Sequence, residues 1–285
     1  MTSLSKSFLA LAAGLLVSLL VVGCKGPAVE VTVTVKQAEG EKAAGKEGDK
    51  EAADAAPAGF GDLNGVVTVD GDVAAAPLVV KKGDAAVKDA AVCAAEDVPD
   101  DSLAVDPKTK GLSSVFVFLA KPPKNINPDL KKDEAKEVIF DQKTCRFIPH
   151  ALLVQTDQVV LVKSDDAVSH NTHTFSTRNP QINTSISPND RKGVVFKVPK
   201  PESRPFEVKC DVHPWMKAYW LTIDHPYGAV TDAQGKFSIK GLPAGNHEFV
   251  VWHERGNVLE RAYKVTIKPG AAQEVALKVP AAKLK

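Results

Sequence analysis

Short apolar runs separated by turn residues occupy most of the chain from Phe60 onward. Runs of this kind that end in Pro, Asp or Lys are typical of antiparallel strands in a sandwich or barrel. The run Val115–Leu119 is apolar throughout, which predicts a fully buried strand. The charged stretch around Pro128 to Lys136 is a helical candidate. The other strands predicted before residue 225 are Val66–Val69, Val138–Phe140, Ala151–Gln155, Val159–Val162, Val194–Val198, Phe206–Lys209 and Tyr219–Ile223.

The same pattern continues to the C-terminus. Predicted strands there are Ala229–Thr231, Phe237–Ile239, Glu248–Trp252, Ala262–Ile267 and Glu274–Val279, separated by turns such as Asp232–Gly235 and Gly241–Gly245. The segment from Gly228 to Trp252 resembles the carboxypeptidase regulatory-like, transthyretin-like β-sandwich, in which an Asp-x-x-Gly-x-Phe turn and a Leu-Pro-x-Gly turn recur. That resemblance implies a C-terminal β-sandwich segment and points to no chemically active residues in it.

The N-terminus indicates export. Lys6 precedes an apolar run from Phe8 to Val22, which is typical of a secretory signal and short for a membrane span. Leu20–Cys24 resembles a bacterial lipobox, which implies cleavage before Cys24 and lipid attachment to its sulfur. An ordinary signal peptide with an incidental Cys is the alternative. Because Lys25 and not Asp follows the Cys, resemblance to the enterobacterial retention rule favours the outer membrane over the inner one. We expect a lipid-anchored protein of the bacterial cell envelope, on the periplasmic side or in the outer membrane.

A tether follows the anchor. Val29–Val35 alternates apolar and polar residues and is a candidate edge strand. From Lys36 to Gly59 the apolar residues are Ala and Pro57, mixed with Glu, Lys, Asp and Gly, so this stretch buries too little surface to fold. We expect a signal peptide over 1–23 and a lipidated, low-complexity, disordered linker over 24–59.

Composition and motifs exclude several functions. The 36 Lys and Arg balance 35 Asp and Glu, and no basic cluster with interleaved aromatics is present, so we expect no nucleic-acid partner. There is no Gly-x-Ser-x-Gly and no phosphate-binding glycine loop. The pairs His247-Glu248 and His253-Glu254 lack the spacing of a zinc protease. His150 and His225 read as turn or packing residues, and a second metal site remains an alternative for them.

The four cysteines divide by role. Cys24 is the candidate lipid anchor, and Cys210 belongs to the loop described next. In an oxidising compartment Cys93 and Cys145 most simply pair as a disulfide. Two buried free thiols are the alternative.

The loop Cys210–Met216 concentrates the candidate chemistry. Its Cys-x-x-His-x-x-Met spacing places a thiolate, an imidazole and a thioether within seven residues, and these are ligand types of a blue-copper site that needs one further His. A loop between strands Phe206–Lys209 and Tyr219–Ile223 can direct all three at one point. The chain has two Met, Met1 and Met216, so this sequence does not commonly use Met to fill its core. A structural role for Met216 remains the alternative.

The missing His lies in the upstream segment His170-Asn171-Thr172-His173. His-Asn followed by Cys-x-x-His-Pro-x-Met resembles the cupredoxin family, and its amicyanin-like members most of all, over roughly residues 138–224. A further resemblance, to exported proteins likened to methylamine-utilization proteins, rests on Asp141-Gln142-x-x-Cys145-x-Phe147-x-Pro149-His150. The resemblance implies one mononuclear type 1 copper held by His170, Cys210, His213 and Met216, with Asn171 tying the two ligand-bearing loops together. His173 is the alternative first ligand.

We therefore expect an all-β chain: a cupredoxin-like Greek-key sandwich over 60–225 and a transthyretin-like segment over 226–285. The expected function is outer-sphere electron transfer to an unidentified redox partner protein, with no enzymatic activity. His213 is expected to be partly exposed as the electron port, beside an apolar docking surface of Pro214, Trp215 and Trp220. A buried core position is the alternative for Trp215. The alternatives are a copper storage or delivery protein and a metal-free sandwich that binds carbohydrate or protein.

Overall fold

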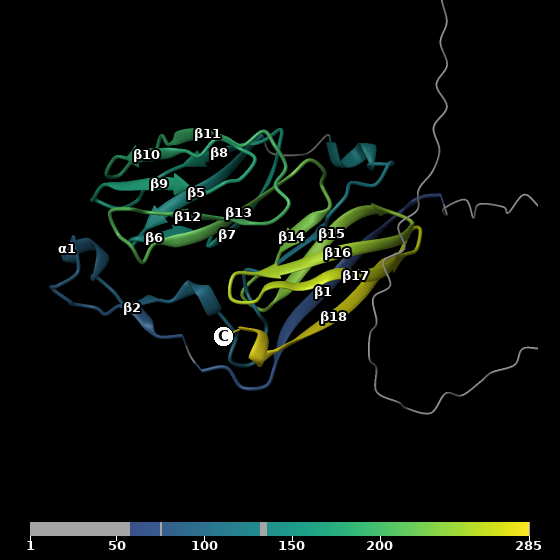
Figure 1. The fold of residues 1–285 in the computed structure, drawn as a ribbon, viewed down its shortest axis with the longest axis horizontal. Coiled ribbons are helices and arrows are strands. Elements are labelled where there is room, and N and C mark those ends of the chain that lie inside the picture. Colours follow the sequence, from purple (N-terminus) through teal and green to yellow (C-terminus); the bar gives the residue numbers. More distant parts are fainter. Residues whose placement is uncertain (1–57, 75, 132–135, 285) are drawn as a thin grey trace, which may run out of the picture. The chain divides into compact units, whose positions relative to one another are not determined.

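The computed structural model describes residues 58–74, 76–131 and 136–284 (Figure 1). The predicted signal peptide over 1–23, Cys24, the candidate strand Val29–Val35 and all but the last two residues of the predicted linker lie outside these residues. The regular secondary structure of the described residues is almost entirely β-strand, as the sequence predicts. Within it, no helix has the length and apolar character needed to cross a membrane.

The elements follow one another as β1 (Phe60–Asp70), β2 (Leu78–Val80), α1 (Ala90–Cys93), β3 (Val98–Pro99), η1 (Asp101–Leu103), β4 (Phe116–Leu119), η2 (Pro128–Lys131), β5 (Glu137–Lys143), β6 (Arg146–Ile148), β7 (Ala151–Gln155), β8 (Val159–Val162), β9 (His170–Thr174), β10 (Asn183–Ile186), β11 (Val194–Lys197), β12 (Phe206–Lys209), β13 (Lys217–Ile223), β14 (Gly228–Val230), β15 (Lys236–Pro243), β16 (Gly245–His253), β17 (Asn257–Ile267), β18 (Ala272–Pro280) and η3 (Ala281–Leu284). Here η marks a 3₁₀ helix. The helical candidate around Pro128 is such a turn in its first four residues, and 132–135 lie outside the described range.

The first sandwich is built from the middle of the chain. One sheet has the order β10-β9-β12-β13-β7 and the other β11-β8-β5-β6. Alternate residues of both sheets meet in one core, in which Phe140, Phe196 and Trp220 are fully or almost fully buried. Phe140 contacts Trp220 edge-on at 4.8 Å between ring centroids. This packing fixes the positions of β9, β12 and β13, which carry the candidate metal ligands.

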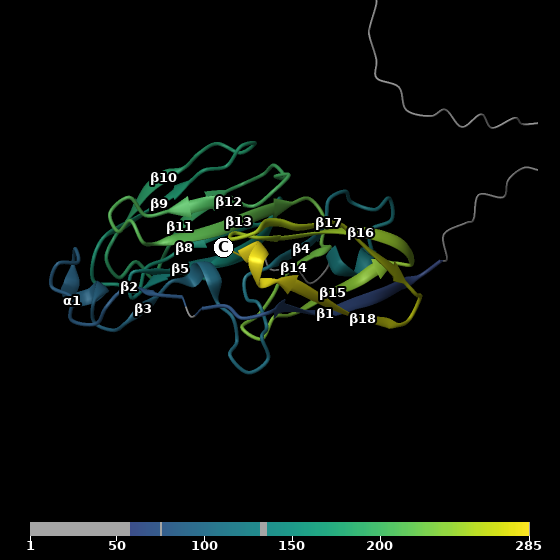
Figure 2. The ribbon, with the colours of Figure 1, turned by 60° about the horizontal axis from the view of Figure 1, so that its bottom comes forward.

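The second sandwich combines strands from both ends of the described chain. One sheet has the order β14-β4-β16-β17 and the other β15-β1-β18. Strand β1 runs parallel to β18, pairing residues 62–70 with 272–280 (Figures 1 and 2). Leu63 and Val67 of β1 pack in one core with Ile239 and Leu277 of the C-terminal strands.

This pairing corrects the predicted division of the chain at residues 225 and 226. Strands β1 and β4 come from the stretch expected to belong to the cupredoxin-like part, yet both pair with C-terminal strands. Their apolar faces are buried against partners more than 100 residues away in sequence. Local patterns identify such strands but not their partners, because strand pairing is decided by the packing of the whole core.

A third apolar cluster joins the two sandwiches. Strand β4 presents Val117 and Leu119 to the second core and Phe116 and Phe118 to this cluster, so it is buried on both faces as predicted. Trp252 of β16 lies 5.8 Å from Phe116, measured between ring centroids, and packs here with residues of β7 and β13.

Candidate metal centre

Three neighbouring strands place the candidate ligands at one end of the first sandwich. Strand β9 begins at His170, β12 ends just before Cys210, and β13 begins just after Met216. Lys209 pairs with Lys217, which closes the loop between β12 and β13. Within the loop the Cys210 N–H donates to the Met216 carbonyl at 3.1 Å, and the Met216 N–H donates to the His213 carbonyl at 2.9 Å. Backbone hydrogen bonds within the loop therefore fix its conformation.

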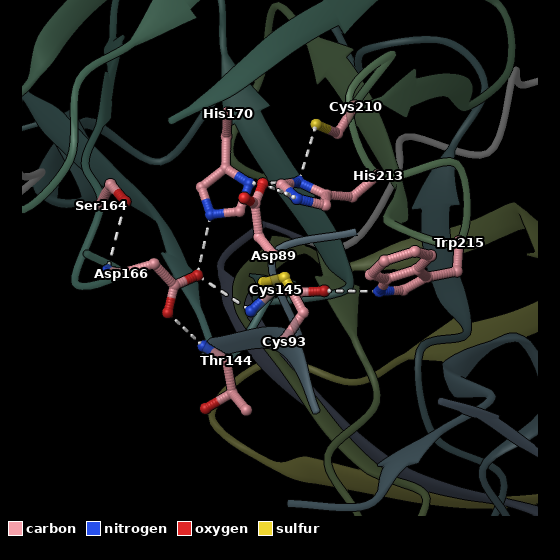
Figure 3. Close-up of a disulfide and its surroundings, with 10 residues drawn as sticks. All are labelled: Asp89, Cys93, Thr144, Cys145, Ser164, Asp166, His170, Cys210, His213 and Trp215. Atoms are coloured by element: carbon pink, nitrogen blue, oxygen red, sulfur yellow. Dashed lines mark hydrogen bonds and ion pairs between the residues drawn. A yellow bond between two sulfur atoms is a disulfide. The ribbon is translucent and has the colours of Figure 1, made fainter. Parts of the chain in front are cut away.

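Two imidazoles and a thiol converge below the surface (Figure 3). The Nδ1 atoms of His170 and His213 lie 3.0 Å apart, and Nδ1 of His213 lies 3.8 Å from Sγ of Cys210. The exposed fractions of these residues are 1%, 0% and 2% for His170, His213 and Cys210. Met216 is 1% exposed and belongs to the same core cluster as Cys210.

A buried carboxylate orients His170. The Oδ2 atom of Asp166 lies 2.9 Å from Nε2 of His170. The backbone N–H groups of Thr144 and Cys145 also donate to this carboxylate, at 2.6 and 2.9 Å. Both of these residues have a left-handed backbone, with φ of 51°, a conformation that side chains other than glycine rarely adopt. The turn between β5 and β6 thus forms a small anion-binding nest for Asp166.

A second carboxylate orients His213. Oδ2 of Asp89 lies 3.0 Å from Nε2 of His213. Asp89 comes immediately before α1, and the last residue of α1, Cys93, forms a disulfide with Cys145. The predicted disulfide is therefore present, and Figure 3 shows it beside the two histidines.

The protonation of this cluster in the metal-free chain follows from these contacts. Burial alone would raise the pKa of Cys210, but hydrogen bonds with His170 and His213 lower it to about 6. Burial alone would lower the pKa of His170, but its bonds to Asp166 and Cys210 raise it to about 8. Burial raises the pKa of Asp166, and the hydrogen bonds of His170 and of two backbone N–H groups outweigh that and lower it. The favoured charges are a thiolate, an imidazolium and a carboxylate.

The donor set fits a metal cation. A carboxylate can only accept, so Nε2 of each histidine carries the hydrogen and each Nδ1 is left with a lone pair. Two lone pairs that face each other at 3.0 Å need a proton or a cation between them. The raised pKa of His170 indicates a proton in the metal-free chain. A metal ion bound by the two Nδ1 atoms and the Cys210 thiolate would take the place of that proton.

Asn171 links the two segments that carry the candidate ligands. Its Oδ1 accepts a hydrogen bond from the Asp211 N–H at 2.7 Å, and its Nδ2 donates to the Asp211 carboxylate, also at 2.7 Å. This is the contact that the sequence resemblance implies for Asn171. His173 instead contacts the Asp211 carboxylate at 3.1 Å and is not part of the cluster of His170, Cys210 and His213.

The expected surface of the site requires correction. His213 is completely buried, so the expectation that its edge is partly exposed is wrong. Trp220 is also completely buried, in the core of the first sandwich, and forms no docking surface. Pro214 is exposed and Trp215 is half-buried, with Nε1 of Trp215 donating to the Cys145 carbonyl at 3.1 Å.

The remaining histidines lie elsewhere. Nε2 of His150 is in close contact with the Glu254 carboxylate, between the two sandwiches. Nε2 of His225 donates to the Leu119 carbonyl at 3.0 Å, which agrees with a packing role. His253 is 1% exposed, and burial lowers its pKa to about 4, so it is neutral near pH 7.

Sequence reasoning missed both carboxylates of the site. Asp166 stands four residues before His170, and its place at the end of a predicted strand was a usable signal. Asp89 lies 124 residues before His213 in an Ala-rich stretch, where nothing local distinguishes it from other exposed acids.

No protein-family model and no curated protein matches the chain. Solved structures similar to parts of it include a copper-containing nitrite reductase from Thermus scotoductus SA-01, with 16% identity, a TM-score of 0.29, and coverage of 35% of this chain and 27% of that one. A reduced mutant of amicyanin has 13% identity, a TM-score of 0.28, and coverage of 38% and 91%. A purple cupredoxin from Nitrosopumilus maritimus has 16% identity, a TM-score of 0.26, and coverage of 31% and 100%. We base the proposed function on the geometry of the site.

Proposed function

We propose that this protein is an exported copper protein that carries single electrons by outer-sphere transfer. The observation that supports this most directly is the convergence of His170 Nδ1, His213 Nδ1 and Cys210 Sγ at one buried point. Two imidazoles and a thiolate form the equatorial ligand set of a blue-copper site, in which a thioether is the weak axial ligand. Met216 is the proposed axial ligand, because it is buried in the same cluster at the end of the same loop.

The neighbouring side chains orient and ionise the proposed ligands for one-electron transfer. Asp166 and Asp89 hold the two rings so that both Nδ1 atoms face the same point, and hydrogen bonding keeps Cys210 largely as the thiolate near pH 7. When bound, copper supplies a one-electron couple between Cu(I) and Cu(II). Because the ligands are oriented by their neighbours, little rearrangement is needed when the charge at the site changes.

Full burial also bears on the choice between electron transfer and copper delivery. A protein that hands its metal to another needs the ligands to open toward a partner. His213 and Cys210 are buried away from solvent, and the Asp89 carboxylate holds Nε2 of His213, the ring nitrogen that faces away from the proposed metal position. This favours an ion that stays in place, and hence an electron carrier.

We propose further that the chain is attached to the bacterial cell envelope by lipid on Cys24 and exchanges electrons there with a redox partner protein. The signal-like run before Cys24 and the lipobox resemblance support the anchor. Cell fractionation tests it: the wild-type protein is expected with the membranes, and the Cys24→Ala variant is expected to leave them. An unchanged distribution contradicts the lipid anchor.

Visible absorption tests the copper site. The full chain, loaded with Cu(II), is expected to show an intense thiolate-to-copper band. Cys210→Ala is expected to abolish the band, and Met216→Leu is expected to keep it and change the reduction potential. A colourless wild-type protein, or a coloured Cys210→Ala variant, contradicts the proposal.

The two neighbouring histidines provide a matched pair. His170→Gln removes a proposed ligand, whereas His173→Gln changes a side chain on the same strand that contacts Asp211 instead. We expect the first variant to lose the band and the second to retain it. The opposite result would assign the ligand to His173.

A further inference from the structure

A segment distant in sequence from the ligand loop lies against His213. We call residues 78–99 the cap segment; it contains β2, α1 and β3. We propose that Asp89, in the cap segment, is a positioning residue for the His213 imidazole, and that the Cys93–Cys145 disulfide holds Asp89 against the ring. This assignment takes His213 as a metal ligand and therefore rests on the proposed function.

Contacts on several sides enclose the His213 ring. The ring centroid of His170 lies 4.8 Å away and that of Trp215 lies 5.3 Å away. Asp89 contacts Nε2, the ring nitrogen on the side away from His170. The Asp89 side chain is 35% exposed while His213 is 0% exposed, so Asp89 stands between this nitrogen and solvent.

The disulfide is one helical turn from Asp89. The Val92 and Cys93 N–H groups both donate to the Asp89 carbonyl at 2.9 Å, which ties the backbone of Asp89 to that of Cys93. Cys93 is bonded to Cys145, the residue whose N–H also holds Asp166. Ligand atoms of Cys93, Cys145 and His213 lie within 4.8 Å of one another. The covalent link therefore sits directly beside the ring that Asp89 contacts.

The cap segment also has apolar contacts. Its own cluster contains three buried residues, Val80, Ala94 and Val98, with Trp215 packed against them, and Val87 and Val92 pack against the core of the first sandwich. Helix α1 has four residues, and an isolated helix of that length is unstable in water. Among the described strands, β2 and β3 pair only with each other, and an isolated two-stranded sheet is marginally stable. The disulfide is thus the covalent link between the short helix that follows Asp89 and the first sandwich.

Two consequences follow for the site. Without Asp89 the His213 ring loses the hydrogen bond at Nε2 that sets its rotation about the Cβ–Cγ bond, so Nδ1 is held less firmly toward Cys210 and His170. The negative charge of Asp89, so close to a ligand, also stabilises the more positive oxidation state of a bound metal. Removing the carboxylate should weaken metal binding, and removing only its charge should raise the reduction potential.

The positioning role is tested first without metal. In ¹⁵N-histidine NMR spectra of the metal-free full chain, the Nε2–H of His213 is expected to be protected from exchange with solvent. Asp89→Ala is expected to remove that protection, and Asp89→Asn is expected to keep it, because the Asn oxygen still accepts. Glu96→Gln, which removes an exposed charge from the same segment, is the control and should change nothing. Unchanged protection in Asp89→Ala overturns the positioning role.

The role of the disulfide is tested by combining variants. Cys93→Ala/Cys145→Ala is expected to remove the same protection, and adding Asp89→Ala to it should cause little further change, since both act through one contact. If the double cysteine variant does not fold, the same spectrum is recorded on wild-type protein after reduction by an excess of a small dithiol. Protection that survives loss of the disulfide overturns this part of the proposal.

Copper affinity and reduction potential, measured on the copper-loaded protein, provide the second test. Asp89→Ala is expected to bind copper about 10- to 100-fold more weakly, the usual effect of losing a partner that orients a metal-ligating histidine. Asp89→Asn is expected to raise the reduction potential relative to both the wild type and Glu96→Gln. An unchanged potential and affinity contradict the proposal. If the wild type itself binds no copper, the proposed function fails, and the metal-free spectra still decide how His213 is positioned.

Discussion

The Nδ1 atoms of His170 and His213 lie 3.0 Å apart, and the opposite nitrogen of each ring contacts a carboxylate. Asp166 supplies one carboxylate from the loop before β9, and Asp89 supplies the other from the segment before α1. Each ring is thus oriented from outside, and the two Nδ1 atoms are directed inward beside Cys210. This arrangement suits a small cation bound between the rings, and several expectations follow from it.

Substitution of Asp166 should weaken the site through His170. Asp166→Asn leaves an amide that can accept from only one oxygen and carries no charge, while three N–H groups compete for it. We expect copper affinity to fall about 10- to 100-fold, measured by competition with a chelator. Asp165→Asn is the matched control, because Asp165 is the adjacent residue and pairs with Lys143 at the surface. Equal affinities in the two variants would contradict this role of Asp166.

The Cys210 thiol should titrate at an unusually low pH in the metal-free protein. Its pKa is about 6, against an ordinary value of 9.0, because hydrogen bonds with the two histidines outweigh the effect of burial. The ultraviolet absorbance of the thiolate should therefore persist at pH 7 and disappear as the pH falls through about 6. His170→Gln should move this transition upward, and a transition that stays in place would show that His170 does not stabilise the thiolate.

The same shift has a consequence for folding stability. Between pH 9 and pH 6 the unfolded chain binds a proton at Cys210 that the folded chain does not. The stabilisation from this thiolate is therefore complete above pH 9 and is lost as the pH falls through about 6. His170 has the opposite sign: its pKa is raised to about 8, so its stabilisation is complete below pH 6.5 and is lost as the pH rises through about 8. Denaturant unfolding of the metal-free Cys210→Ala variant should lack the first dependence.

The Cys93–Cys145 disulfide should stabilise the fold as well as the site. The two residues are 52 apart in sequence, and cross-linking a loop of that length lowers the entropy of the unfolded chain by an amount worth about 4 kcal/mol. We expect Cys93→Ala/Cys145→Ala to lose stability of that order in denaturant unfolding of the metal-free protein. Ala95→Ser, a change at an exposed position of the same segment, should unfold like the wild type. A loss below about 1 kcal/mol would mean that the unfolded chain is already constrained in this region.

The contact between the two sandwiches should contribute to folding stability, as the two cores do. Trp252 is 5% exposed and packs against Phe116 and Tyr219, with centroid distances of 5.8 and 5.1 Å. Trp252→Ala leaves a cavity there and should lower the free energy of unfolding by about 3–5 kcal/mol. Val258→Ala, at a 37% exposed position on the neighbouring strand, is the control and should cost much less. Similar losses for both would show that the two sandwiches do not depend on this cluster.

Much of the strand content was predictable from short-range patterns. The predicted ranges Ala151–Gln155 and Phe206–Lys209 coincide with β7 and β12, and the fully apolar run at Val115 is the doubly buried β4. The short strands β2, β3, β6 and β10 and the His170 strand β9 were missed. These strands are too short, or too polar at β9, to show a period of two that local reasoning can recognise.

The candidate site divides in the same way. The sequence by itself determined the candidate ligand types and their spacing in the Cys210–Met216 loop, because these depend on residues close together in the chain. The Asn171 link joins residues 40 apart and was expected only from the family resemblance. Only the tertiary structure decided that Asp89 and the disulfide close over His213, that Trp220 is core, and that β1 and β4 belong with the C-terminal strands. Each of these features depends on which distant segments pack together. Their packing is decided by the burial of apolar faces across the whole chain, and a local sequence pattern does not contain that information.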